Sequence, residues 1–178
     1  MTSAADAPYP PLPGPSDGAA GPDVAFDTLT QAHAALLRLV EGQSSVLCCF
    51  SAEFSAWPLQ RPEFIRALEQ WALRDPRRHE VLRLLAVDWS TVQLRFPRFV
   101  AFRQTFAHLI ACRRIAEARL DGLHEMAWTP QAAVYAKTAT WMTGQCVRDP
   151  ARLQALRLRF DDAWEQAVPA FPAHTLGL

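Results

Sequence analysis

The sequence predicts an α/β fold, a three-layer sandwich in which a mixed sheet with central parallel strands is flanked by helices. The first observation is the run EVLRLLAVD at 80–88, which is almost wholly apolar, closes on a carboxylate and has the pattern of a buried central strand. Long helical patterns lie on either side of it. The order of elements is helix, strand, helix, strand, helix, further strands and a last helix, which is typical of such a sandwich.

The chain is long enough for one well-buried core, because it has 178 residues and half of them are hydrophobic. Residues 1–24 are rich in Pro, Gly, Ala and Ser, and such a segment cannot bury enough surface to offset its ordering entropy. We expect a disordered tail there, with a proline-rich ligand for a partner domain as the alternative. Residues 25–178 are then expected to form a single α/β domain.

The first half of this domain has the pattern of one β-α-β unit. An amphipathic helix is predicted over 25–41, with Gly42 at its C-terminal cap. A short β-favouring run, SVLCCFS at 45–51, is the first strand. Pro62 opens a second helix, which Asp75-Pro76 stops before the central strand. Two strands joined by a helix in this way are expected to be parallel and right-handed.

The segment after the central strand is predicted to be helical. Ser90 is a suitable cap for a helical region that reaches about His108, and Pro97 divides it into a short turn and a helix. The run LIACRRI at 109–115 is predicted to be the next strand.

The C-terminal part is predicted to hold two short strands and a helix. Residues 132–138 and 141–147 have the pattern of an antiparallel pair. Asp149 followed by Pro150 is a strong helix start, and Pro169 ends the helix. The last residues are expected to pack back through Leu176 and Leu178.

Charge and cysteine content restrict the function. The 18 basic and 18 acidic residues cancel, which disfavours nucleic-acid binding in general without excluding a local patch. No CxxC is present, so reduced, buried thiols are expected in place of a zinc or redox site. The pair His108 and Cys112 and the lone His33 are interpreted as structural, and no metal or cofactor is expected. The four cysteines are Cys48, Cys49, Cys112 and Cys146.

The sequence contains no charged-then-apolar leader and no apolar run near 18 residues, so a cytoplasmic protein without a membrane span is expected. It also lacks a Gly-rich phosphate loop, a GxSxG elbow and an HExxH motif, which disfavours the common enzyme classes that use them.

The order of elements, the central strand that ends in Asp88, the RFDDAWEQ helix and the terminal LGL are familiar. Over roughly 26–178 the chain resembles the phospholipase D-like superfamily, especially a small bacterial branch of unknown function. Active members carry His-x-Lys, four residues, then Asp. Phosphodiester cleavage there needs the histidine nucleophile and the lysine charge together.

This motif is incomplete here. Tyr135-Ala136-Lys137 has Met142 where the Asp would stand, and His124-Glu125-Met126 has no lysine at its second step. The resemblance therefore implies a catalytically degenerate member, a non-enzymatic binding or interaction module. Because superfamily domains of this length pair to build one site, it also implies a homodimer. The prolines and Trp57, Trp89, Trp128 and Trp141 are compatible with an interface to a protein partner, although a core position is the favoured interpretation of each tryptophan.

Two other functions stay open. One is a residual phosphodiesterase or phosphate-ester enzyme that uses Lys137, the only lysine, with Tyr135 or His124. The other is weak nucleic-acid binding through Arg95, Arg98, Arg103, Arg113, Arg114 and Arg119.

A ligand site in such a sheet is expected at the carboxyl ends of the parallel strands, near Ser51, Asp88 and Arg113, with Lys137 as the retained phosphate contact. Asp88 can equally cap the helix after it, which is the interpretation we favour.

Overall fold

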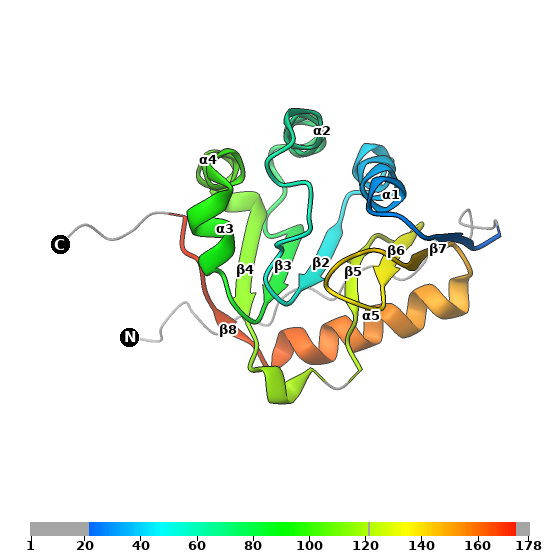
Figure 1. Cartoon of the computed structure of the whole chain (residues 1–178). Helices are drawn as coiled ribbons and strands as arrows, with labels where there is room; N and C mark the ends of the chain where they lie inside the picture. The colour runs from blue at the N-terminus through cyan, green and yellow to red at the C-terminus, as the bar shows by residue number, and fades with distance from the viewer. Residues whose placement is uncertain (1–21, 121, 174–178) are drawn as a thin grey trace.

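The computed structural model describes residues 22–120 and 122–173, and these form a mixed sheet with helices on both faces (Figure 1). The strand order is β1-β7-β6-β5-β2-β3-β4-β8, in which β2, β3 and β4 are parallel and all other neighbours are antiparallel. The strands are β1 Val24–Phe26, β2 Leu47–Ser51, β3 Leu82–Ala86, β4 Ile110–Arg114, β5 Glu125–Trp128, β6 Ala133–Ala136, β7 Gly144–Val147 and β8 Val168–Pro169.

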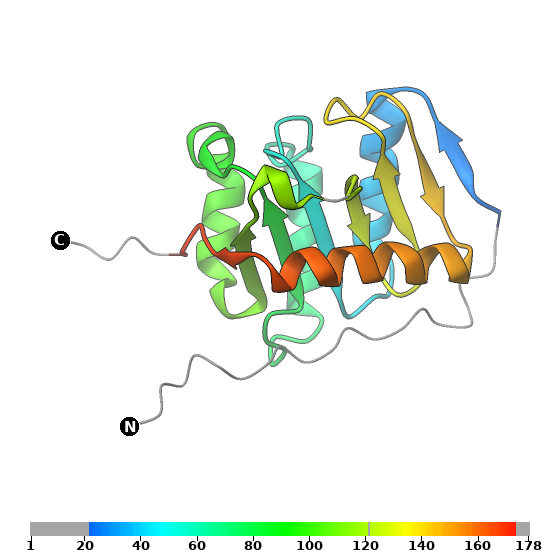
Figure 2. The same cartoon turned by 90° about the horizontal axis from the view of Figure 1, so that it is seen from below.

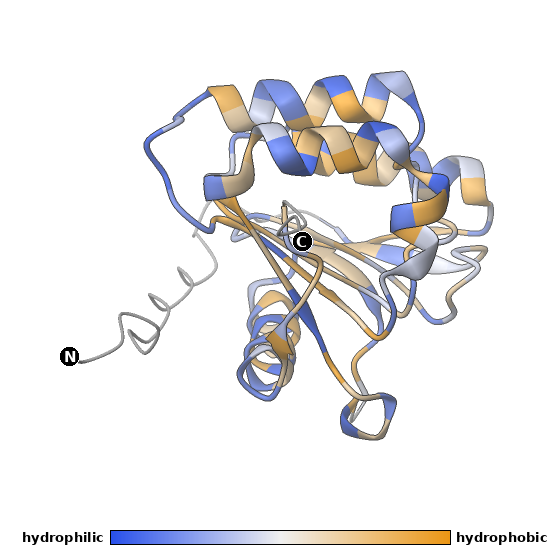
Figure 3. Cartoon of the chain, turned by 90° about the vertical axis from the view of Figure 1, so that its left-hand side faces the viewer, coloured by the Kyte–Doolittle hydropathy of each residue, from blue (hydrophilic) through white to orange (hydrophobic). Residues whose placement is uncertain are grey.

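Four helices cover one face of the sheet, and one long helix crosses the other (Figures 1 and 2). Single 3₁₀ turns at Ala107–Leu109 and Glu117–Arg119 flank β4. In Figure 3 the strands between the helices are mainly hydrophobic in colour, as expected for a sheet covered on both sides. The helices are α1 Leu29–Glu41, α2 Pro62–Leu73, α3 Ser90–Arg95 and α4 Pro97–Thr105 on the first face, and α5 Pro150–Glu165 on the second.

The predicted central strand is confirmed as β3, which lies between β2 and β4. Every residue of β2 and β3 is buried, because alternate side chains enter two separate hydrophobic clusters. Leu84 contributes to the cluster under α1, α2 and α4, and Leu85 to the cluster under α5. The predicted parallel pairing of β2 with β3 is also confirmed.

Most helix ends follow the sequence signals, but α5 ends at Glu165, and Pro169, which was expected to end it, lies in β8. The N–H of Gly42 donates to the carbonyl of Arg38 at the end of α1, and Pro62 begins α2. The Asp149 carboxylate accepts the N–H of Arg152 at 2.9 Å, so it caps α5 as predicted. Pro97 divides α3 from α4, also as predicted.

The predicted start of the first helix was wrong. Residues 24–26 pair with β7 as an edge strand, and α1 begins at Leu29 after the cap Thr28. Phe26 fitted the helical stripe in sequence, but its ring lies over Gly144, where a Cβ would come within 2.3 Å of it. A side chain at 144 would therefore clash with the Phe26 ring and, at 2.1 Å, with the carbonyl of Tyr135 on β6.

The strand β5 was not predicted, because it is only four residues long and Glu125 interrupts its apolar pattern. It pairs with β2 on one side and with β6 on the other, so it joins the parallel and antiparallel halves of the sheet. The predicted antiparallel strands at 132–138 and 141–147 are confirmed as β6 and β7. Leu176, Leu178 and residues 1–21 of the predicted disordered tail lie outside the described residues, whereas Val24, also assigned to that tail, begins β1.

Aromatic and sulfur-containing side chains mostly belong to the core. The tryptophans Trp57, Trp89, Trp128 and Trp141 are all buried, so within this chain they are core residues and not exposed contacts. Cys48, Cys49 and Cys112 are buried free thiols, and Cys146 is half-buried. Burial raises the pKa of Cys112 to about 11, which makes its thiolate scarce at neutral pH.

His33 on α1 holds the segment before α2. Its Nε2 lies 2.7 Å from the carbonyl of Ala56, while Nδ1 is buried with no hydrogen-bond partner among the described residues. Burial lowers the pKa of His33 below its ordinary value, a shift that Arg61 reinforces and that the Ala56 carbonyl and Glu63 oppose.

We expect the free energy of unfolding to fall as pH drops below about 6.5, because the unfolded chain then binds a proton on His33 that the folded chain resists. His33→Gln keeps an N–H donor without titrating and should show a smaller loss between pH 7.5 and 5.5. Urea unfolding of both proteins at each pH measures this, and equal losses in the two proteins would contradict it.

Candidate functional site

Three candidate residues from the sequence lie together at one end of the sheet. Glu125 of β5 is paired with Ala136 of β6, so the neighbouring His124 and Lys137 are side by side where β5 begins and β6 ends. Tyr135, two residues before Lys137, points to the same face, towards α5. The groove there has a volume of about 350 Å³ and is lined by His124, Tyr135, Lys137, Arg152, Ala155, Leu156 and Arg159.

Arg152 is the most firmly held cation of this groove. Its Nη2 donates to Gln145 Oε1 at 2.7 Å and to the Tyr135 hydroxyl at 3.2 Å, and its Nη1 forms an ion pair with Asp23. The Tyr135 hydroxyl in turn donates to Gln145 Oε1 at 3.2 Å. This network fixes the guanidinium at the start of α5.

The other basic side chains of the groove are held more loosely. Arg159 donates to the carbonyl of Gly122 at 3.3 Å, and the His124 ring stacks on Tyr135 with centroids 6.2 Å apart. Among the described residues, none forms a hydrogen bond or ion pair with the Lys137 ammonium. No acidic side chain of the described residues lines this groove, so we call it the basic groove.

Arg152 and Arg159 were not identified as site residues from the sequence. Their seven-residue spacing is two turns of α5, which puts both on one side of the helix. The signal was therefore present in the sequence. It could be used only once the pairing of β5 with β6 showed which side of the helix faces Lys137.

The predicted ligand residues Asp88, Arg113 and Lys137 are not brought together. Strands β5 and β2 separate β6 from β3, so Lys137 lies about 14 Å across the sheet from the end of β3. Asp88 accepts the hydroxyl and N–H of Ser90 at the start of α3, and these bonds lower its pKa. Arg113 donates to the carbonyl of Trp164 at 2.8 Å, where its charge stabilises the end of α5.

A row of buried aromatic rings fills the carboxyl ends of the parallel strands, where a ligand was expected. Successive centroids are 5.0–6.4 Å apart. Three members adopt positive φ, which is strained for such bulky residues: Phe54, Trp141 and Phe171. In order, the row is Phe26, Trp141, Trp57, Phe54, Trp89 and Phe171.

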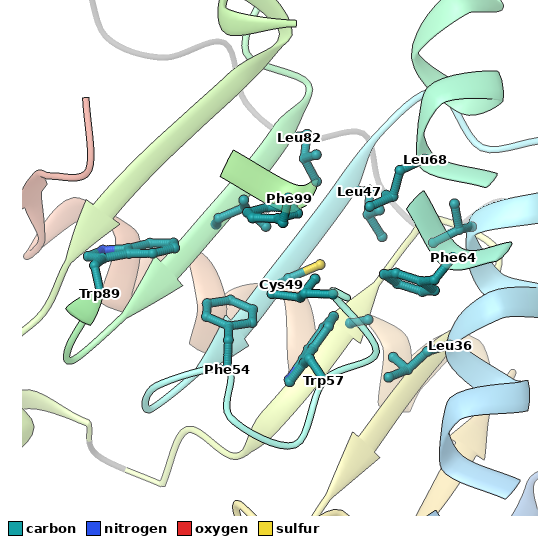
Figure 4. A pocket seen from close by; sticks show the side chains of 14 residues that line it. Leu36, Leu47, Cys49, Phe54, Trp57, Phe64, Leu68, Leu82, Trp89 and Phe99 are labelled. Atoms are coloured by element: carbon teal, nitrogen blue, oxygen red, sulfur yellow. The ribbon is translucent and has the colours of Figure 1, made fainter. Parts of the chain in front are cut away.

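Figure 4 shows the cavity beneath this row, with the rings of Phe54, Trp57, Trp89 and Phe99 pointing into it. Its volume of about 20 Å³ is close to that of one or two water positions, and its lining exposes no polar surface. It is a dry packing void and not a ligand site.

The buried carboxylate of Glu125 holds this end of the sheet together. It accepts the N–H of Ala52 at 2.7 Å, the Trp141 indole at 2.9 Å and the Trp57 indole at 3.4 Å. Glu125 is only 6% exposed. It therefore joins the first residue of β5 to the loops after β2 and β6, which places the adjacent His124 in the basic groove.

We expect Glu125→Ala to lower the free energy of unfolding by about 3 kcal/mol, because three buried N–H donors lose a charged acceptor. Chemical denaturation measures the change. Glu117→Ala, at an exposed position, is the matched control and should change it by less than about 0.5 kcal/mol. A similar small change in both variants would show that the hydrogen bonds of Glu125 contribute little to the free energy of unfolding.

A second groove of about 250 Å³ lies between the end of α1 and strands β6 and β7, and its charged lining residues in the described part of the chain are Arg38 and Arg148. No group of three His, Cys, Asp or Glu suited to a metal occurs in the described part of the chain. His108 bonds the carbonyl of Pro76 at 2.9 Å, in keeping with a structural role.

Two of the six arginines named for nucleic-acid binding, Arg103 and Arg113, are not exposed. Arg103 is 8% exposed and donates to the carbonyl of Ala107, and Arg113 is used at the end of α5. Within residues 22–120 and 122–173, no helix is long and apolar enough to cross a membrane.

Comparisons with known proteins give a family and a fold. The family model described as Domain of unknown function (DUF7931) matches residues 28–176. No curated protein matches the sequence.

Two of the solved structures that resemble the fold are Nuc and TrmBL2. Nuc from Salmonella typhimurium, a phospholipase D family member, has 10% identity and a TM-score of 0.58 over 84% of this chain and 97% of its own. TrmBL2, an archaeal chromatin protein described with a novel mode of DNA binding, has 11% identity and a TM-score of 0.61 over 84% of this chain. The match spans about half (54%) of the TrmBL2 chain. At these identities the likeness concerns the fold alone.

Proposed function

The chain belongs to the family described as Domain of unknown function (DUF7931), and we propose that it is a non-enzymatic module that binds a phosphate-bearing ligand in the basic groove. One observation carries the proposal: the basic side chains of His124, Lys137, Arg152 and Arg159 line one groove, and no acidic residue among those described lines it with them. The scaffold would be a degenerate phospholipase D-like one, and the likeness to Nuc supports it at the level of fold.

The chemistry of the groove suits a phosphate better than a neutral ligand. Arginine offers a planar fork of donors for phosphate oxygens, and lysine adds a mobile point charge. The apolar atoms of Ala155 and Leu156 lie between these groups and can contact the organic part of a phosphate ester.

Binding without catalysis fits the surroundings of each reactive group. Met126, where an active His-x-Lys motif would have its lysine, is fully buried in the core. The Tyr135 hydroxyl is engaged by Arg152 and Gln145. His124 and Lys137 are neighbours, but they come from different strands and belong to two incomplete motifs.

We expect the full chain to bind pyrophosphate, with Lys137→Ala and Arg159→Ala each weakening the affinity about tenfold through loss of a charge-assisted contact. Isothermal titration calorimetry at low salt measures this. Arg66→Ala, an exposed arginine on α2 at the opposite face, is the matched control and should bind as the wild type does. Equal affinities in all four proteins would refute the groove as the site.

A residual phosphodiesterase is the second candidate, and it is favoured by the single groove that Lys137, Tyr135 and His124 share. In that case a chromogenic phosphodiester would be hydrolysed by the wild type and not by Lys137→Ala. We expect no turnover above the uncatalysed rate in either protein. Turnover that disappears in the variant would replace the binding module with an enzyme.

A homodimer and DNA binding are further proposals, with less support than the phosphate-bearing ligand. A homodimer follows from the phospholipase D-like resemblance. DNA binding is stated for TrmBL2, and for this chain it would need an affinity that falls steeply with salt.

A further inference from the structure

Arg152, one of the four basic residues that line the basic groove, is already paired with a carboxylate of the chain itself. Asp23 pairs with Nη1 of Arg152 and accepts the N–H of Arg148 at 2.8 Å and of Asp149 at 3.4 Å. It therefore lies at the N-terminus of α5 with three donors around it, which is how a protein holds an anion. The side chain of Asp23 is 22% exposed and that of Arg152 is 41% exposed, so solvent and ligands reach this pair.

Both terminal nitrogens of Arg152 are engaged, Nη1 by Asp23 and Nη2 by Gln145 and Tyr135. A phosphate that binds Nη1 of Arg152 and the N–H groups of Arg148 and Asp149 must therefore take the place of Asp23. Gln145 lies on β7 and is paired with Ala25 on one side and Tyr135 on the other. Asp23 precedes a three-residue edge strand that pairs on one side only, so it is the partner that can leave.

We propose that Asp23 is an internal competitor for the ligand, so that binding in the basic groove and docking of β1 oppose each other. This inference rests on the proposed function, because it concerns the regulation of the same site. Asp23 also neutralises part of the positive charge that attracts an anion. By linkage, if Asp23 weakens ligand binding, ligand must weaken the docking of Asp23 and β1 by the same factor.

Pyrophosphate titration of the full chain tests the competition. Asp23→Asn removes the charge but keeps an oxygen acceptor for the N–H groups of Arg148 and Asp149, and it should bind pyrophosphate about tenfold more tightly than the wild type. Asp23→Ser is a second variant that also keeps an acceptor at a helix start. Asp27→Asn makes the same charge change at an exposed neighbouring position and should leave affinity unchanged.

Hydrogen exchange gives the second readout. In the wild type, saturating pyrophosphate should speed exchange of the amides of residues 24–26, while the amides of β3 stay protected. Tighter binding in both Asp23 variants together with this faster exchange supports the proposal.

Unchanged affinity in both Asp23 variants overturns the competition and leaves the proposed function intact. Tighter binding without faster exchange overturns the coupling to β1. Absence of pyrophosphate binding in every protein overturns the proposed function, and the competition with it.

Discussion

The buried carboxylate of Glu125 is the interaction on which the rest of this end of the molecule depends. A carboxylate at such depth is stable only where donors satisfy it, and here the donors are one backbone N–H and two indoles. Those indoles belong to loops that follow different strands, so one side chain fixes two loops and the first residue of β5. The row of aromatic rings packs around the same point and closes the crevice that an α/β sheet usually leaves open for a ligand.

The position of the basic groove follows from the direction in which the Glu125 side chain points. Glu125 points to the face that α1–α4 cover, so its chain neighbours His124 and Met126 point to the α5 face. Met126 completes the core under α5, while His124 lies beyond the core edge beside Lys137. The long helix α5 then adds two arginines from one side. The groove is therefore built from the first turns of α5 and the paired ends of two strands, and not from the carboxyl ends of the parallel strands.

Much of the fold could be predicted from local patterns. Strand β3 was identifiable because a strand buried on both faces is a continuous apolar run, and α5 because Asp149-Pro150 is a strong start signal. Strand β5 could not be, because the burial of Glu125 depends on Trp57 and Trp141, which are distant in sequence. The sequence predicts helix over most of β1, because Phe26 fits a helical stripe. The pairing of β1 with β7 and the contact of Phe26 with Gly144 are long-range interactions that the local pattern does not contain. The site residues divide in a similar way. Tyr135, Lys137 and His124 can be named from partial motifs in the sequence. Arg152, Arg159 and Asp23 can be assigned to the site only once the strand pairing is known.

We infer that an anion binds between α5 and the ends of β5 and β6. Nuclear magnetic resonance titration of the uniformly ¹⁵N-labelled chain with pyrophosphate tests this binding site residue by residue. We expect saturable shifts at the amides of His124, Lys137 and Arg159 and at Asp23, with little change around Arg38 at the second groove. Shifts that cluster at Arg38 and Arg148, or no saturable shifts at all, would contradict it.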